Sequence, residues 1–243
     1  MVYAREVDSY PEPLTFGVSG KLIMNVLVMY DRQTESLWSQ ILGQAVEGEL
    51  AGTRLKPLVS LQTTWGQWKE LHPDTLVLRK GRAGSYDPYT DYYIRNSAGV
   101  LGETRRDDRQ PTKAVGIGVV VNEEPAFFPV SKLRDEPVVN DVVGGEPILV
   151  TFHAEVATGL VFRRSVEGRV LTFALEEAGG EFTTLVDAET GTRWSAFSGV
   201  GLEGPLAGKV LERIPATTSF WFGWKDWHPD TRVYGVDEAP PSS

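Results

Sequence analysis

Two stretches of the chain place a large apolar residue at every third position. They are residues 64–75 and 220–231, which lie 156 positions apart (220 − 64 = 156). The apolar residues are Trp65, Trp68 and Leu71 in the first stretch and Trp221, Trp224 and Trp227 in the second. This spacing puts them on one face of a short helix, and a proline near the end of each stretch stops it. The pattern predicts two short helices that each bury one face, with a stacking platform for a ligand as the alternative role of the indoles.

For the polar residues at the ends of these helices, a structural role is the preferred interpretation. Thr63 or Thr64, and Ser219, can each cap a helix by accepting a hydrogen bond from an N–H group of its first turn. His72 and His228 stand at the opposite ends, where a histidine can bond the last carbonyls and is favoured as a cation by the helix dipole. A role as ligand or proton carrier stays open for both histidines.

Further segments repeat with the same offset and predict strands joined by turns. A turn that opens at Asp31 corresponds to one that opens at Asp187, and residues 47–55 correspond to residues 203–211. An aspartate that opens such a turn normally bonds the nearby backbone, so both carboxylates are interpreted as structural before catalytic. Because glycines and prolines also occur throughout, the sequence indicates a mainly β fold with short helices. A tandem internal repeat is expected to form two related lobes.

The repeat suggests a division of the chain. Residues 1–79 are expected to be an incomplete first repeat, 80–113 an irregular connecting loop, 114–235 a complete second repeat, and 236–243 a disordered tail. On this reading the first repeat lacks about 44 opening residues (115 − 159 = −44, with a local offset of 162 − 3 = 159). Strand edges in the first lobe should then be exposed, or covered in a homo-oligomer by another chain.

Composition narrows the functional classes. The net charge is 24 − 33 = −9, which argues against nucleic acid or an anionic membrane as the main partner. No apolar run is long enough to span a bilayer, and the chain does not begin with a signal peptide. It is therefore expected to be cytoplasmic as it stands, and extracytoplasmic if a leader lies upstream. The absence of cysteine excludes disulfides, thiolate nucleophiles and cysteine-bound metals.

Several long segments together resemble a known protein family, the domain-of-unknown-function family 3179. The segments are 14–20 (LTFGVSG), 28–40 (VMYDRQTESLWSQ), 50–53 (LAGT), 139–145 (VNDVVGG), and 220–224 (FWFGW) with 229–231 (PDT). The resemblance covers nearly the whole chain, and it implies an architecture without a defined chemistry. Family members also carry a Cys-Pro-Leu-Cys element just before the point that matches Met1, and such an element can hold a soft metal or run thiol chemistry. This chain is expected to lack that chemistry.

Three functions remain in competition. The first is a non-catalytic, β-rich binding or interaction module, which the wide separation of His72, His153 and His228 along the sequence favours. The second is an enzyme or soft-metal carrier whose remaining half-site would be lined by four candidate ligand-binding residues. They are Met29, Asp31, Trp38 and Gln40. The third is a structural or assembly domain. No catalytic residue, metal ligand, cofactor or small-molecule ligand is assigned.

Overall fold

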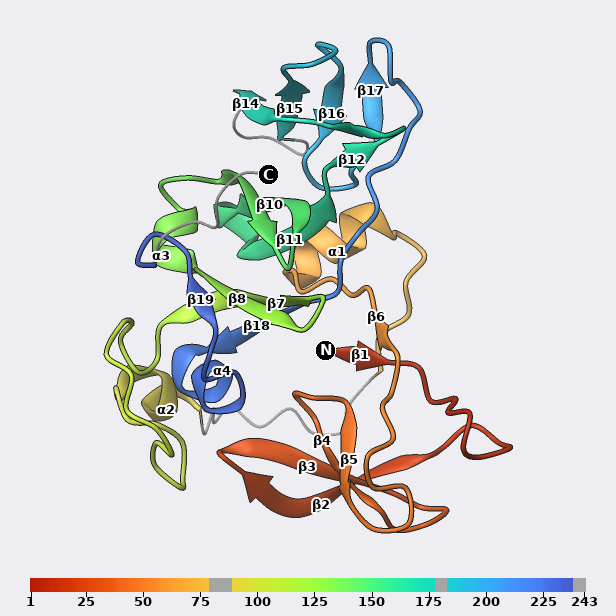
Figure 1. Ribbon diagram of the computed structural model, residues 1–243, viewed down its shortest axis with the longest axis vertical. Coiled ribbons are helices and arrows are strands. Elements are labelled where there is room, and N and C mark those ends of the chain that lie inside the picture. The colour runs from red at the N-terminus through yellow and green to blue at the C-terminus, as the bar shows by residue number, and fades with distance from the viewer. Residues whose placement is uncertain (79–88, 178–182, 238–243) are drawn as a thin grey trace.

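The computed structural model describes residues 1–78, 89–177 and 183–237. In these residues the chain is β-rich, as the sequence predicts, and its helices are short. Several small sheets are stacked along the long axis of the molecule, with a central sheet between two outer meanders (Figure 1).

The central sheet has the strand order β18-β7-β8-β19. Its strands are β7 (Val115–Val121), β8 (Glu124–Pro129), β18 (Ala216–Phe220) and β19 (Arg232–Val233). The β7–β8 hairpin is antiparallel, β18 lies along its β7 edge, and β19 runs parallel to its β8 edge. Helix α4 (Trp221–Trp227) connects β18 to β19 and packs on the sheet, while α3 (Val130–Leu133) follows β8. One segment, residues 216–233, therefore wraps both edges and one face of the hairpin.

A three-stranded sheet packs against the central one and shares its core. Its strands are β9 (Val138–Val143), β10 (Glu146–His153) and β11 (Thr158–Arg163), with a 3-10 turn, η1 (Ala154–Val156), between the last two. Ile117, Phe128, Ile148 and Val150 are buried together between these two sheets. The strands alternate inward and outward residues, so each sheet gives this core one of its faces.

Two antiparallel meanders lie at opposite ends of the molecule (Figure 1). The lower one consists of β2 (Phe16–Ile23), β3 (Val26–Asp31), β4 (Leu37–Ser39) and β5 (Gln44–Glu47). The upper one consists of β14 (Phe173–Glu177), β15 (Thr184–Asp187), β16 (Arg193–Ser195) and β17 (Gly201–Glu203). Both meanders have the same strand order. The edge strands of the lower meander, β2 and β5, pair on one side only among the named strands of the described residues.

Smaller elements complete the chain. They are the strand pairs β1 (Val2–Tyr3) with β6 (Pro57–Leu58) and β12 (Ser165–Val166) with β13 (Arg169–Val170), and the helices α1 (Trp65–Leu71) and α2 (Thr90–Ile94). Helix α2 lies inside the segment expected to be an irregular loop, part of which falls outside the described residues. Most of the expected tail also falls outside the described residues. Within it, Asp237 is described, and its carboxylate accepts a hydrogen bond from the Arg109 guanidinium.

The two predicted helices differ in burial and in how they begin. Helix α4 buries its aromatic face, as predicted, but no residue of α1 is buried, so the same prediction is wrong for α1. Thr64 caps α1, as predicted, because its hydroxyl accepts a hydrogen bond from the Gln67 N–H at 3.3 Å. The expectation that Ser219 caps α4 is wrong. Ser219 belongs to β18 and pairs with Gly116, so the N-cap is Phe220 and the Ser219 hydroxyl is buried without a partner.

A buried aspartate organises each meander. The indole N–H of Trp38 donates to Asp31 Oδ2 at 2.8 Å, and that of Trp194 donates to Asp187 Oδ2 at 2.8 Å. The backbone N–H of Thr190 donates to the other Asp187 oxygen at 2.5 Å. All four bonded aromatic and acidic residues are fully buried. The carboxylates thus join the turn to the core of the sheet, which supports the structural interpretation of both.

These hydrogen bonds favour the ionised carboxylates. Burial alone raises the pKa of Asp187, but the hydrogen bonds from Trp194, Thr190 and Thr192 together outweigh burial and lower the pKa below its usual value. The pKa of Asp31 is lowered in the same way, with burial opposed by bonds from Trp38 and Thr34. Each carboxylate therefore stabilises the folded chain while it is ionised.

Asp187→Asn should lower the free energy of unfolding at pH 7 by about 1.5–3 kcal/mol, because it removes a buried charge-assisted acceptor of the indole. The folded-state pKa is lowered, so this contribution is present above the unfolded pKa of about 3.9 and is lost as the pH falls below it. The difference between wild type and variant in urea unfolding should therefore shrink between pH 7 and pH 3. Glu49→Gln changes an exposed acid of the lower meander and is the control. A difference that stays constant with pH would contradict the prediction.

Candidate functional site

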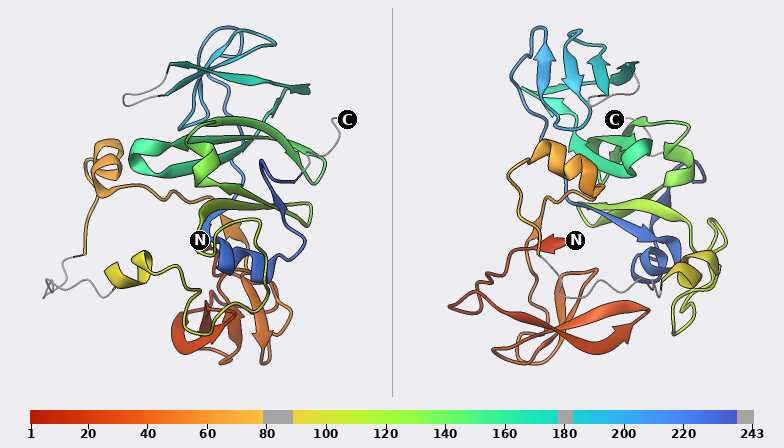
Figure 2. Two further views of the ribbon diagram at one scale, coloured as in Figure 1. Left: turned by 90° about the vertical axis from the view of Figure 1, so that its left-hand side faces the viewer. Right: turned by 180° about the vertical axis from the view of Figure 1, so that it is seen from behind.

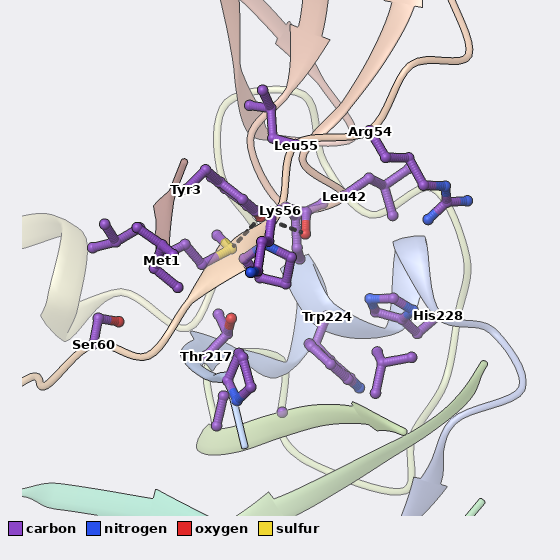
Figure 3. Close-up of a pocket in the computed structure, with 18 residues that line it drawn as sticks. Met1, Tyr3, Leu42, Arg54, Leu55, Lys56, Ser60, Thr217, Trp224 and His228 are labelled. Atoms are coloured by element: carbon purple, nitrogen blue, oxygen red, sulfur yellow. Dashed lines mark hydrogen bonds between the residues drawn. The ribbon is translucent and has the colours of Figure 1, made fainter. Parts of the chain in front are cut away.

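The main candidate site is a pocket between the lower meander and the central sheet (Figure 3). Its volume is about 500 Å³. It is bounded on one side by the strand pair β1–β6 and residues 54–60, and on the other by β7, β18 and α4. The segments that meet there are far apart in sequence, so only the tertiary fold creates the pocket.

Most of the pocket wall is apolar. Leu42 and Leu55 contribute from the lower meander, and Val120, Ala216 and the Trp224 ring contribute from the central sheet and its helix. A smaller pocket of about 360 Å³ shares residues with this one and extends it toward β11. Its wall is more polar, with Ser60, Gln62, Thr63, Thr217 and Thr218 among its residues. The combined hollow therefore has an apolar part and a hydroxyl-rich part.

Tyr3 forms one wall and is held firmly. Its hydroxyl donates to the backbone carbonyls of Gln40 at 2.8 Å and Ile41 at 3.2 Å. Its ring lies against Gly43, whose positive φ and closeness to the ring leave no room for a side chain. Burial raises the pKa of Tyr3 to about 12, so the phenol remains protonated at neutral pH.

His228 enters the pocket from the C-terminal end of α4 beside Trp224 (Figure 3). The two rings contact each other, with centroids 4.2 Å apart. The indole N–H of Trp224 donates to the Thr231 hydroxyl at 2.9 Å, which fixes the ring over Gly118. In the described part of the chain, no group hydrogen-bonds the imidazole of His228. Burial lowers the pKa of His228 to about 4. The sequence-based expectation of a cation favoured by the helix end is therefore wrong, because desolvation keeps this imidazole neutral.

Two cations stand at the edge of the pocket. Arg54 and Lys56 flank Leu55, which is buried in the core of the lower meander. Both cations are among the residues that line the pocket. Neither has an ion-pair or side-chain hydrogen-bond partner among the residues that the structure describes. Figure 3 places the Arg54 guanidinium and the His228 ring on the same side of the hollow.

The four candidate residues chosen from the sequence lie outside this pocket. Asp31 and Trp38 are fully buried and bonded to each other in the lower meander, where Met29 packs against the same core. Gln40 contacts the site only through its backbone carbonyl, which accepts from Tyr3. The fold therefore brings Asp31, Trp38 and Met29 together inside the sheet, and their role in ligand binding stays a prediction.

Sequence reasoning missed Tyr3, Arg54 and Lys56. A cation on each side of a leucine is visible in the sequence, but nothing in the sequence indicates which surface these side chains meet. His153 lies apart from the pocket, with its Nε2 atom buried and unbonded and its pKa lowered, mainly by burial. No group of three histidines or acids within the described ranges is placed to hold a metal ion.

The chain belongs to the domain-of-unknown-function family that its sequence segments resemble. The model of the family described as "Protein of unknown function (DUF3179)" matches residues 1–231. No curated protein and no solved structure matches the chain. Of the helices in the described residues, none is both long and apolar enough to cross a membrane.

His228→Gln should make the chain less sensitive to acid. The folded-state pKa of about 4 lies below the unfolded value of about 6.5, so the wild type loses stability as the pH falls through this window. Between pH 6.5 and pH 4 the free energy of unfolding should decrease in both proteins. We expect the decrease to be roughly 1–3 kcal/mol smaller in the variant than in the wild type. Denaturant unfolding at several pH values measures this, and His72→Gln, the exposed counterpart in α1, is the matched control. Parallel pH profiles for the wild type and His228→Gln would refute it.

Proposed function

We propose that this chain is a non-catalytic binding module whose site is the pocket between the lower meander and the central sheet. Its ligand is a small molecule with an apolar body and an acidic group. The observation that carries the proposal is a pair of cations, Arg54 and Lys56, at the edge of an apolar hollow, neither of which has a side-chain partner among the described residues. They are available for a ligand in a chain whose net charge is −9.

The chemistry of the wall supports this ligand class. Binding of an apolar body is favourable because it displaces water from the side chains of Leu55, Val120 and Trp224. An acidic group at the edge can form charge-assisted hydrogen bonds with the guanidinium and the ammonium group, and these are stronger than neutral hydrogen bonds. The neutral imidazole of His228 offers one further donor and one acceptor. Binding therefore needs no change in the protonation of the protein at neutral pH.

The same geometry favours binding over catalysis. A general base needs a pKa near the working pH and a partner that orients it. The His228 pKa of about 4 leaves the imidazole a weak base, and its ring lies in tilted contact with that of Trp224. The alternative of an enzyme or soft-metal site at Met29, Asp31, Trp38 and Gln40 remains a prediction. Trp38 and Asp31 are already hydrogen-bonded to each other in the core of the lower meander.

We also propose that the two meanders and their following helices derive from one duplicated unit, which forms two related lobes. The Asp31–Trp38 and Asp187–Trp194 bonds support this, since the matched residues are 156 positions apart and both bonds are 2.8 Å long. The Ser36 hydroxyl accepts from the Leu50 N–H, just as the hydroxyl of Thr192 accepts from that of Leu206. Shared local bonds at a constant offset are typical of internal repeats.

The ligand proposal is tested with two probes that share an aromatic body. The anion 8-anilinonaphthalene-1-sulfonate carries a sulfonate, and N-phenyl-1-naphthylamine lacks it. In fluorescence titrations, Arg54→Ala/Lys56→Ala should weaken binding of the anionic probe at least tenfold and that of the neutral probe less than twofold. Lys21→Ala removes an exposed lysine of β2 and is the control. Equal affinity of the anionic probe for the wild type and the double variant would overturn the proposed ligand class.

A second variant tests the place of the site. Val120 lines the pocket and is 43% exposed, so Val120→Trp should fill the hollow without disturbing the core. Both probes should then lose most of their binding. Val170→Trp, at a similarly exposed position outside the pocket, should leave both affinities unchanged. If Val120→Trp binds the probes like the wild type, the site lies elsewhere.

A further inference from the structure

Helices α1 and α4 share one local structure. In α4, the Trp224 indole donates to Thr231 at 2.9 Å, and the Trp224 and His228 rings are 4.2 Å apart. In α1, the Trp68 indole donates to the Thr75 hydroxyl at 2.9 Å, and the Trp68 and His72 rings are 4.1 Å apart. The C-cap residues of the two helices have nearly the same backbone angles, with φ −134° and ψ 73° for His72 and φ −128° and ψ 70° for His228. Segment 60–78 is thus a local copy of segment 216–234.

The surroundings of the two segments differ. Segment 216–234 encloses the β7–β8 hairpin, with β18 on one edge, β19 on the other, and α4 over the face. Trp221 is fully buried there, next to Phe127 with ring centroids 5.1 Å apart. Its counterpart Trp65 is 52% exposed, and no residue of α1 is buried. Figure 2 shows α1 at the outside of the molecule.

The chain after α1 is exposed as well. Val233 of β19 is fully buried beside β8. Its counterpart Val77 is 71% exposed, and the neighbouring Leu76 and Leu78 are 96% and 86% exposed. Such a run of exposed apolar residues beside an exposed tryptophan marks an interaction surface. We call Trp65, Trp68, Leu71 and residues 76–78 the α1 surface.

We infer that the α1 surface docks a β-hairpin of a partner polypeptide, in the way that segment 216–234 holds β7–β8. One strand of the partner would lie beside residues 60–64, and the other would receive residues 76–78. The internal copy specifies the chemistry of the partner. Gly118 faces the Trp224 ring so closely that any side chain would collide with it. The partner hairpin therefore carries a glycine opposite Trp68.

The internal copy adds two requirements. An aromatic residue of the partner should lie against Trp65 and Trp68, as Phe127 lies against Trp221 and Trp224. In α4, the Asp226 carboxylate accepts from the backbone N–H groups of Thr104 and Arg105 at 3.0 and 3.1 Å. Glu70 of α1 is the counterpart of Asp226 and is exposed. A partner loop with free N–H groups can bond Glu70 in the same manner.

A second folded copy of this chain does not meet these requirements. Its own β7–β8 hairpin has both edges paired, by β18 and β19, and its face covered by α4. Offering that hairpin to another copy would require α4 to leave its place, which exposes Trp221, Trp224 and Phe127. The occupant is therefore a hairpin outside this folded unit, with the pattern of β7–β8.

The test uses a cysteine introduced into this cysteine-free chain. The thiol of Val77→Cys is labelled with a thiol-reactive dye, alone and with a backbone-cyclised peptide of residues 114–130 as the probe hairpin. The peptide should slow labelling at least tenfold. The same peptide with Gly118→Val should not slow it, because the added side chain collides with Trp68. Val210→Cys, which is 62% exposed and lies outside the α1 surface, should be labelled at the same rate throughout.

A tethered version removes dependence on the affinity of the free peptide. Residues 114–130 are joined to the chain through a flexible Gly/Ser linker, which raises the effective concentration. Protection of Val77→Cys in either format, lost with Gly118→Val, supports the proposal. Labelling that is unchanged in both formats overturns it. It is also overturned if labelling slows with protein concentration alone and sedimentation shows a dimer, since the occupant would then be a second copy.

Discussion

The packing of Trp224 over Gly118 is the contact on which the rest of the structure depends. A glycine at this place on β7 lets the indole approach the backbone closely, and the Thr231 bond holds the ring in that position. The helix thereby covers one face of the hairpin, and β18 and β19 reach both of its edges. Because the His228 ring contacts the same indole, the Trp224–Gly118 contact also places the imidazole in the pocket.

The meanders depend on a different constraint. Each of them buries an aspartate carboxylate whose oxygens must accept hydrogen bonds. An ionised carboxylate away from water is tolerated only when its oxygens are satisfied, and in each meander one turn and one indole provide the donors. This makes the turn, the tryptophan and the strand between them a single unit. The pocket lies where the lower meander and the segment that follows it meet the central sheet.

The sequence predicted local features well, because those features depend on neighbours along the chain. The helices at residues 65–71 and 221–227, the structural role of Asp31 and Asp187, and the β-rich class all follow from spacing and turn chemistry. The pocket could not be predicted in this way. Its cations come from residues 54–56 and its histidine from residue 228, and only the tertiary fold brings them together. Ser219 was misjudged for a related reason, since pairing with β7 extends the strand up to the helix.

One sequence pattern thus has two different environments in the same molecule. The exposed α1 and the buried α4 differ mainly in whether a hairpin lies beneath them, so their stabilities should differ although their local bonds agree. Tertiary packing, and not helix propensity, is what stabilises this short helix in our account.

Native-state hydrogen exchange measures this directly. The amides of residues 221–227 should exchange only in openings that approach global unfolding, while those of residues 65–71 should exchange by local fraying, orders of magnitude faster. Equal protection of the two helices would contradict the account.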